Sequence, residues 1–353
     1  MELLLERNHF NMKNILVTIP VEQRHKEYLE KIGTGCRFYY TLPDKVCTSQ
    51  KDINCEKFDE DISSLAMTEE KLSQADIIIG NVEPRLLKYA KRLQWIQLNF
   101  AGSDTYCMTG ILRPGTILTN ATGAYGLAIS EYMVGMSFLL QNKFYQYYNN
   151  QLQHQWKDMG RVTSVQGGTV LIVGLGDIGG EYAKRMKALG SYTIGVRRTP
   201  GEKPEYLDEL YTTESLDQLL PRADFVALSL PNSPSTHHII DERRLRLMKP
   251  GAYLINVGRG NAIDTEALCK VLKEGWLGGC GVDVTDPEPL PSDHPLWDAP
   301  RMVITPHISG QYHLQETFER IVMIAGENLK KFLAGDIEHM ISLVDFKTGY
   351  RKR

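Results

Sequence analysis

Three ionisable side chains with complementary chemistry lie in the second half of the sequence. Arg259, Glu288 and His307 each come soon after a short apolar run that is typical of a buried strand. A guanidinium can hold a carboxylate through two hydrogen bonds and polarise an adjacent carbonyl. An imidazole can give a proton to that carbonyl oxygen near neutral pH, and a carboxylate beside its second nitrogen orients the ring and favours its charged form. Together the three types suit hydride transfer at a hydroxyl-bearing carbon.

Each of these residues also has a plainer interpretation when it is taken alone. His307 could be a hydrogen-bonded core histidine, Glu288 a solvated residue of a proline-rich turn, and Arg259 a surface arginine between glycines. Ligands of open α/β sheets, however, bind outside the carboxyl ends of the strands. Because the three residues follow three separate predicted strands, one cleft could collect them, and their joint placement favours the catalytic interpretation.

A glycine-rich segment earlier in the chain indicates the cofactor. It reads Gly174-Leu175-Gly176-Asp177-Ile178-Gly179 and lies between an apolar strand, Thr169–Val173, and a helical pattern that leads to a second strand, Tyr192–Val196. The first glycine permits a tight turn, the second lets a pyrophosphate approach the backbone, and the third lets helix and strand pack closely. The free N–H groups of the helix N-terminus would hold the pyrophosphate. This strand–turn–helix context predicts dinucleotide binding.

The end of the second strand indicates which dinucleotide. NAD-binding domains of this kind carry an acidic residue about 20 positions after the first glycine, where it binds the ribose 2′-hydroxyl. This chain has Arg197, Arg198 and Thr199 there, and no Asp or Glu lies between Glu181 and Glu202. Two guanidinium groups would attract a 2′-phosphate, so we expect NADP to be preferred, with NAD possible. The alternative is that both arginines point to solvent and that the enzyme does not discriminate.

The elements around the glycine segment predict a doubly wound nucleotide-binding domain. Four more strand candidates follow the two just described, with predicted helices between them. Six parallel strands with helices on both faces form a Rossmann-type sheet. The four strands are Phe225–Ser229, Ala252–Asn256, Gly278–Val284 and Met302–Thr305, and the helices are Leu216–Leu220, Asp241–Met248 and Thr265–Glu274.

The first part of the chain also alternates short strands and helices, which predicts a second parallel sheet covered on both faces. Because it lacks the glycine segment, we expect this part to meet the substrate. The predicted strands are Asn14–Thr18, Ala75–Ile79, Trp95–Leu98 and Thr116–Thr119, and the predicted helices are Glu22–Ile32 and Pro84–Lys91.

Two long helical patterns connect and complete the predicted domains. Ala121–Tyr148 reads as one helix with an aromatic far end, which either packs on its own domain or forms a subunit interface, where aromatic residues are enriched. His313–Leu333 reads as an amphipathic helix that packs back on the first domain and makes it discontinuous. We therefore expect an α/β protein of two domains. These are a substrate domain, residues 1–120 and 307–353, and an NAD(P)-binding Rossmann domain, residues 121–306, with residues 1–11 as an extension outside the fold.

The composition is typical of a soluble globular protein. A net charge of −3 over 353 residues gives no sign of a nucleic-acid-binding surface, and no apolar run is long enough to span a membrane. The 6 cysteines form no CxxC pair and show no metal-site spacing, which is typical of reduced thiols in a cytosolic protein. We therefore expect a cytoplasmic protein with no nucleic-acid partner, no membrane partner and no metal.

After Met12 essentially the whole chain resembles the D-isomer-specific 2-hydroxyacid dehydrogenases. The glycine segment, the turn Asn256–Gly260, the loop Asp283–Pro289 and the pair Pro306-His307 match the motifs of that family in its order. The resemblance implies an enzyme that interconverts a small 2-oxo acid and its D-2-hydroxy acid. It implies that Arg259 binds the substrate, that His307 is the acid/base and that Glu288 is the partner of the histidine.

The resemblance also implies further contacts and an assembly. It implies a flavodoxin-like substrate domain whose loop, here Phe100-Ala101-Gly102-Ser103, offers backbone N–H groups to the substrate carboxylate. It implies that Ser229-Leu230-Pro231 and Asp283 contact the ribose and nicotinamide end of the cofactor, and it extends the cofactor site to Val257, Gly258 and Gly310. Homodimers formed through the cofactor domain are usual in the family.

Two departures from the family pattern bear on the substrate. Phe100 stands where the family usually has a small residue, so the family's substrate pocket cannot simply be carried over to this chain. The regulatory domain of the longer serine-biosynthesis members is not expected at the C-terminus, which argues against 3-phosphoglycerate. We expect small or medium 2-oxo acids such as glyoxylate, hydroxypyruvate or an apolar analogue, while the particular acid and the physiological direction stay open.

Two alternative functions also stay open. Corepressor-like proteins that sense dinucleotides share this fold and can keep the Arg/Glu/His set. Phosphite or formate oxidation would keep the enzyme class and change the chemistry, although formate-type relatives carry glutamine where Glu288 stands. The sequence shows no charged tail or peptide-docking extension, which favours the enzyme.

Overall fold

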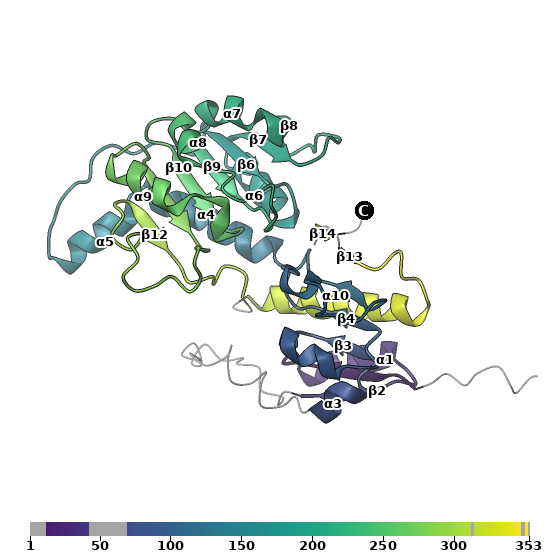
Figure 1. Cartoon of the computed structure of the whole chain (residues 1–353). Helices are drawn as coiled ribbons and strands as arrows, with labels where there is room; N and C mark the ends of the chain where they lie inside the picture. Colours follow the sequence, from purple (N-terminus) through teal and green to yellow (C-terminus); the bar gives the residue numbers. More distant parts are fainter. Residues whose placement is uncertain (1–11, 42–68, 312–313, 347–349, 352–353) are drawn as a thin grey trace, which may run out of the picture. The chain divides into compact units, whose positions relative to one another are not determined.

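The computed structural model describes residues 12–41, 69–311, 314–346 and 350–351. The chain divides into two compact units, one formed by Met1–Ala124 with Phe318–Arg353 and the other by Tyr125–Thr317 (Figure 1). The expected extension at residues 1–11, the first residue of the predicted helix His313–Leu333, and Cys47 and Cys55 lie outside the described residues. The other four cysteines are free thiols.

The first unit contains a parallel five-stranded sheet in the order β2-β1-β3-β4-β5, which is the flavodoxin-like order. Its strands are β1 (Asn14–Val17), β2 (Arg37–Tyr40), β3 (Ile77–Ile79), β4 (Trp95–Gln97) and β5 (Ile117–Thr119). Its helices are α1 (Gln23–Ile32), α3 (Glu69–Gln74), the 3₁₀ turns η2 (Pro84–Tyr89) and η3 (Thr105–Cys107), and α10 (Gln315–Leu333). A short antiparallel pair, β13 (Val344–Asp345) and β14 (Tyr350–Arg351), follows α10.

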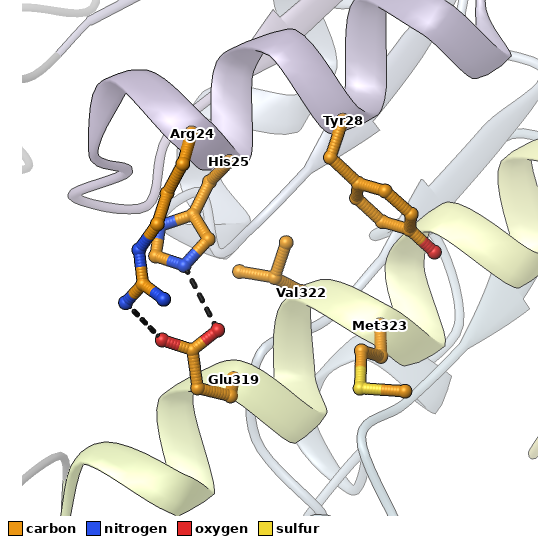
Figure 2. Close-up of a pocket in the computed structure, with 6 residues that line it drawn as sticks. All are labelled: Arg24, His25, Tyr28, Glu319, Val322 and Met323. Atoms are coloured by element: carbon orange, nitrogen blue, oxygen red, sulfur yellow. Dashed lines mark hydrogen bonds and ion pairs between the residues drawn. The ribbon is translucent and has the colours of Figure 1, made fainter.

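Helix α10 completes the first unit although it is far from the sheet in sequence. Phe332 stacks on Trp95 of β4 with ring centroids 5.2 Å apart. At the other end of the helix, Glu319 forms an ion pair with Arg24 and accepts a hydrogen bond from Nε2 of His25 at 3.1 Å, both on α1 (Figure 2). The small hollow between α1 and α10 is lined by Arg24, His25, Tyr28, Glu319, Val322 and Met323, and so by none of the predicted catalytic residues. The helix therefore serves to close the first unit.

The second unit contains a parallel seven-stranded sheet in the order β12-β11-β10-β9-β6-β7-β8. Its strands are β6 (Thr169–Val173), β7 (Tyr192–Arg197), β8 (Glu209–Thr212), β9 (Phe225–Leu228), β10 (Tyr253–Asn256), β11 (Gly279–Val282) and β12 (Met302–Ile304). Its helices are α4 (Gly126–Gln141), α5 (Phe144–Leu152), α6 (Asp177–Ala188), α7 (Leu216–Leu219), α8 (Glu242–Leu247) and α9 (Thr265–Lys273), with 3₁₀ turns η4 (Thr213–Ser215), η5 (Leu220–Arg222) and η6 (Gly260–Ala262). The strand order reverses between β6 and β9, as in a Rossmann domain.

The expected fold of two parallel-sheet α/β domains is confirmed, but one edge strand of each parallel sheet was not predicted. The Rossmann sheet has seven strands rather than six, because β8 adds an edge strand beside β7. Strand β2 is likewise an edge strand, beside β1. Neither β2 nor β8 has a buried residue, so neither shows the apolar run by which the other strands were found.

The prediction of one helix over Ala121–Tyr148 is wrong. Helix α4 ends at Gln141, and Lys143 adopts a left-handed conformation with φ 58° before α5 begins. Met133, Met136 and Leu140 bury one face of α4, whereas α5 has no buried residue. The first helix therefore packs on its own unit and the second exposes its aromatic side chains. Within the described parts of the chain, no helix is long and apolar enough to cross a membrane.

Candidate active site

The register of the seven-stranded sheet aligns the strand ends that carry the predicted site. Neighbouring strands pair residue by residue at their carboxyl ends, so the residues that follow form a row along one edge. The paired end residues, in order across the sheet, are Val196, Val173, Leu228, Asn256, Val282 and Ile304. The next residues in that row are Arg197, Gly174, Ser229, Val257, Asp283 and Thr305.

His307 and Glu288 form a hydrogen-bonded pair at this edge. Nδ1 of His307 lies 2.5 Å from Oε1 of Glu288, and the two side chains are 50% and 40% exposed. A carboxylate can only accept a hydrogen bond, so Nδ1 carries a proton and the exposed ring offers Nε2 to a ligand. The arrangement can therefore hold, give or take one proton at Nε2.

The loop that carries His307 is held by a buried carboxylate. Asp283 is 1% exposed, and its Oδ1 accepts hydrogen bonds from the Thr305 hydroxyl at 2.6 Å and the Ile308 N–H at 2.9 Å. Its Oδ2 accepts from the N–H of Ser309 at 3.0 Å and from the hydroxyl of the same residue. Because both carboxylate oxygens bind this loop, Asp283 fixes the position of the backbone that carries His307. The cofactor contact that the family resemblance implies for Asp283 stays a prediction.

The side chain of Tyr132 and the backbone of His307 also support this loop. The hydroxyl of Tyr132 on α4 lies 2.7 Å from Oγ1 of Thr305. Burial, together with the negative charge of Asp283, raises the pKa of Tyr132, so this hydroxyl stays neutral. His307 itself adopts a left-handed backbone with φ 54° and donates its N–H to the carbonyl oxygen of Asp283 at 2.8 Å. The sequence analysis did not identify Tyr132 or Thr305 as site residues. The position of Thr305 at the end of a predicted strand was a signal for that residue, whereas nothing in the sequence indicated Tyr132.

Arg259 lies on a turn that packs against the loop of Glu288. The turn is closed by Asn256, whose Oδ1 accepts from the N–H of Gly258 at 3.0 Å and whose Nδ2 donates to the carbonyl oxygen of Arg259 at 2.9 Å. A Cβ placed on Gly260 would lie 2.0 Å from the carbonyl of Thr285, so the two loops are in backbone contact. The half-buried Arg259 donates from Nη1 to the carbonyl oxygen of Gly258 at 2.9 Å.

The glycine segment forms the expected turn between β6 and α6. Gly174 has φ +103°, and a Cβ there would lie 2.6 Å from the carbonyl oxygen of Ser229. The Ser229 hydroxyl donates to the Gly174 carbonyl oxygen at 2.7 Å, and a Cβ on Gly179 would lie 1.9 Å from that same oxygen. The first and third glycines are therefore required by packing.

The second glycine and the helix N-terminus suit a phosphate-bearing ligand. A Cβ on Gly176 would meet no atom of its surroundings within 4 Å, so the backbone is open to a ligand just where α6 begins. The side chain of Leu175 packs instead over Gly195, and Oδ2 of Asp177 accepts the N–H of Gly126 at 2.7 Å. The residues present therefore fit a dinucleotide pyrophosphate at this N-terminus.

The remaining predicted cofactor residues belong to the second unit. Arg197 ends β7, with its guanidinium over Gly201, followed by the exposed Arg198 and the half-buried Thr199. Leu230 is buried, and its backbone packs within 2.5 Å of a Cβ placed on Gly258. The other members, Pro231, Val257, Ile178 and Gly310, also belong to the second unit. The substrate loop Phe100–Ser103 belongs to the first unit, after β4.

Comparisons with known proteins agree with this arrangement. Residues 134–309 match the model of the "D-isomer specific 2-hydroxyacid dehydrogenase, NAD binding domain". A glyoxylate reductase from Thermococcus litoralis is 32% identical over 281 residues, which is 76% of this chain and 83% of that protein. A glyoxylate/hydroxypyruvate reductase B from Pectobacterium carotovorum is 31% identical over 278 residues, 76% of this chain and 85% of that protein.

A solved structure extends the similarity to both units. The crystal structure of a D-isomer specific 2-hydroxyacid dehydrogenase family protein from Aeromonas salmonicida superposes with a TM-score of 0.77 at 30% identity, covering 95% of this chain and 99% of that one. These relatives confirm the expected enzyme class, and the matched NAD binding domain supports a nicotinamide dinucleotide cofactor. The chain belongs to the D-isomer specific 2-hydroxyacid dehydrogenase family, as an oxidoreductase of 2-hydroxy and 2-oxo acids.

Proposed function

We propose that this protein reduces a small 2-oxo acid to its D-2-hydroxy acid with His307 as acid/base, Glu288 as its partner and Arg259 on the substrate. The contact between Nδ1 of His307 and Oε1 of Glu288, 2.5 Å long and beside the glycine segment of the same sheet edge, carries this proposal. It is the arrangement by which a histidine acts as a proton donor or acceptor of fixed orientation.

The roles follow from which atoms are engaged. Glu288 holds Nδ1 and stabilises the charged ring, so Nε2–H gives its proton to the carbonyl oxygen during reduction and takes it back from the hydroxyl during oxidation. Arg259 binds the carboxylate and polarises the carbonyl, which requires its guanidinium to leave the carbonyl oxygen of Gly258 or to share its donors. When bound, the nicotinamide supplies or accepts the hydride.

The substrates we propose are glyoxylate, hydroxypyruvate or a small apolar 2-oxo acid. The relatives named glyoxylate reductase, 31–32% identical over about three quarters of the chain, support this class. One arginine and the N–H groups of Phe100–Ser103 suit a single carboxylate, and Phe100 offers an apolar wall. We propose no second phosphate site, so a phosphorylated substrate should be poor.

The direct test follows the ultraviolet absorbance of reduced nicotinamide with a panel of 2-oxo acids. We expect turnover of glyoxylate, hydroxypyruvate or a small apolar member, and little with 3-phosphohydroxypyruvate. Equal or better activity on the phosphorylated acid would overturn the substrate proposal. Absence of turnover on every 2-oxo acid would instead favour a dinucleotide-sensing binding protein.

We also propose that NADP is preferred over NAD. Arg197 ends the strand beside the glycine segment, and Gly174 N–H donates to the carbonyl oxygen of Val196 at 2.9 Å, so a ribose of a bound dinucleotide would lie near Arg197. A charged hydrogen bond contributes about 1.5–3 kcal/mol, and about 1.4 kcal/mol is tenfold in affinity. One or two contacts to a 2′-phosphate therefore predict about ten- to several-hundred-fold preference.

The preference is tested by kcat/KM with NADPH and NADH for the wild type and for Arg197→Asp. We expect the variant to lose most of the preference, whereas Arg113→Asp, the same change at an exposed arginine of the other unit, should leave it unchanged. A wild type that favours NADH, or an unmoved ratio in Arg197→Asp, would contradict the proposal.

The place of the pyrophosphate has its own test. Gly176→Ala should weaken binding of NADPH, measured by nicotinamide fluorescence, because the added methyl group enters the open space at the start of α6. The structure accommodates this methyl group, so the melting temperature should hold. Gly135→Ala on α4 is the control, since a Cβ there also meets nothing within 4 Å but lies away from the glycine segment.

We further propose that the protein is a homodimer formed through the cofactor unit; like the expected cytoplasmic location, the dimer is a prediction. Phe144, Tyr148 and Leu152 on α5 are 56%, 59% and 63% exposed, and Trp156 after it is fully exposed. Aromatic residues are enriched in protein interfaces. Tyr148→Glu should dissociate the dimer in light scattering, whereas Met323→Glu, at a side chain of the other unit that is 60% exposed, should not.

A further inference from the structure

We propose that Asn120 is a positioning residue of the substrate site, because its side chain turns the backbone N–H of Gly102 toward the substrate carboxylate, next to the N–H of Ala101, which the backbone of Ala121 orients. Asn120 follows β5 directly, and the last residue of that strand, Thr119, pairs with Gln97 at the end of β4, so Asn120 lies beside the start of the substrate loop. The inference rests on the proposed function and assigns a role to a residue outside the three ionisable side chains.

Two carbonyl groups of the substrate loop are tied to the end of β5. Nδ2 of Asn120 donates to the carbonyl oxygen of Ala101 at 2.8 Å. The N–H of Ala121 donates to the carbonyl oxygen of Phe100 at 2.9 Å. Two consecutive peptide groups of the loop are therefore held with their oxygens toward the junction of β5 with the chain that follows it.

The direction of these carbonyls fixes the direction of the next N–H groups. Both peptide bonds are trans, and in a planar trans peptide the N–H points opposite to the C=O. The N–H of Ala101 therefore points away from the N–H of Ala121, and the N–H of Gly102 points away from Nδ2 of Asn120. Neither donates a hydrogen bond to any described residue, and both residues are only half-buried, so two neighbouring donors remain available for an anion.

Asn120 is itself held on its remaining polar atoms. It is 4% exposed, and its Oδ1 accepts from the N–H of Thr122 at 3.1 Å. Its own N–H donates to the carbonyl oxygen of Ser342 at 3.2 Å, and the Ser342 hydroxyl donates to the carbonyl oxygen of Thr122 at 3.1 Å. Ser342 is fully buried and follows α10 in the chain. The segment after α10 thus braces the residue that orients the substrate loop.

The test replaces only the donor of Asn120. Asn120→Asp keeps the shape and the oxygen that accepts from Thr122, but its ionised form cannot donate to Ala101. We expect KM for the preferred 2-oxo acid, and Ki for the non-reacting mimic oxalate, to rise about ten- to a hundredfold at neutral pH, with kcat less affected and the Kd of NADPH unchanged. At lower pH the introduced carboxyl is protonated and donates again, so the KM ratio of variant to wild type should fall.

Two further proteins complete the experiment. Asn14→Ala removes a similar donor in the same unit, because Nδ2 of Asn14 donates to the carbonyl oxygen of Gln74 at 3.0 Å. Asn14 begins β1 and so lies at the amino end of that strand, whereas Asn120 follows the carboxyl end of β5, and the change should leave KM unchanged. Asn120→Ala, which cannot regain a donor, should show the raised KM without recovery at low pH. A merely structural role would lower the melting temperature and the active fraction while leaving KM and its pH dependence unmoved, and that result would overturn the proposal.

The proposed function and this inference can fail separately. A wild type that is inactive on every 2-oxo acid would contradict the proposed function. Direct binding of oxalate to the wild type and to Asn120→Asp would still test the role of the two N–H groups. An active wild type whose KM and oxalate affinity are unaffected in both Asn120 variants would sink the inference alone.

Discussion

The carboxyl edges of the two parallel sheets carry different kinds of side chain. At the seven-stranded sheet the strand ends are followed by ionisable residues, among them Arg259, Asp283 and His307. At the five-stranded sheet, β3, β4 and β5 are followed by three amides, Asn81, Asn99 and Asn120. Both sheets have the same parallel architecture, so the architecture does not explain this difference.

On the proposed function, this difference separates proton transfer from recognition of the substrate. Groups that exchange a proton must be ionisable, and on the seven-stranded sheet Asp283 and Glu288 hold His307 and its loop in place. Groups that only hold an anion do not need to titrate, and on the five-stranded sheet neutral amides tie down the loop backbone; Oδ1 of Asn81, for example, accepts the N–H of Asn99 at 3.1 Å. Changes at the first edge should therefore lower kcat, and changes at the second should raise KM.

The strongest test of this division is His307→Ala. We expect kcat to fall by about 10²–10⁴-fold, the usual contribution of general acid/base catalysis, while binding of oxalate changes little. His339→Ala is a matched control, because Nδ1 of His339 also lies 2.5 Å from a carboxylate, that of Asp336, in the other unit. Near-normal turnover in His307→Ala would contradict the assignment of proton transfer to the edge of the seven-stranded sheet.

Glu288→Gln should lower kcat, but by less than His307→Ala. The amide oxygen of the variant can still accept a hydrogen bond from Nδ1 of His307, but it carries no charge that stabilises the ring while it holds the transferred proton. Steady-state kinetics measure the effect, with Asp336→Asn as the control. An unchanged kcat would show that the pair does not serve catalysis.

Phe100→Ala tests substrate recognition at the carboxyl edge of the five-stranded sheet. The Phe100 side chain is 51% exposed at the start of the substrate loop, where it would limit the size of the acid. We expect kcat/KM for bulkier apolar 2-oxo acids to rise about tenfold while the value for glyoxylate changes little. Met108→Ala, at a side chain 62% exposed in the same unit, is the control. A uniform loss on all acids would place Phe100 outside the pocket.

The smallest expected effect belongs to Ser342→Ala. The change removes the hydroxyl that donates to Thr122 at 3.1 Å, so the free energy of unfolding of the first unit should fall by about 0.5–1.5 kcal/mol. The backbone bond from Asn120 remains, so KM should rise no more than about twofold. Thermal melting and steady-state kinetics check this against Ser73→Ala, whose hydroxyl also donates to a backbone carbonyl, at 2.7 Å on the exposed face of α3. A KM change as large as that of Asn120→Asp would show that the hydroxyl itself orients the loop.

The sequence was sufficient wherever burial leaves a local pattern. Strands β9 and β10 are buried throughout and were found as apolar runs, and the glycine segment stood out because packing requires its first and third members. The edge strands β2 and β8 were missed because their residues meet solvent. The break at Lys143 was missed because a left-handed residue other than glycine leaves little trace in composition.

Some residues of the candidate site could be identified from the sequence, and others could not. Arg259, Glu288 and His307 could be named because each is a reactive type just beyond a strand. The function of Asp283 as the anchor of the His307 loop could not be, because its partners, from Thr305 to Ser309, reach it only when β11 and β12 pair. The same holds for Asn120, whose contact with Ala101 depends on the pairing of β4 with β5.

Closure of the first unit by α10 also bears on the order in which a growing chain can fold. Domains generally fold as units, the N-terminal one first during synthesis. Here Gln97, 1% exposed, accepts a hydrogen bond from Asn328, a residue that leaves the ribosome only after the whole of Tyr125–Thr317. We therefore expect the second unit to complete first on the ribosome, and the nascent first sheet to expose Trp95 and Gln97 to chaperones until α10 arrives.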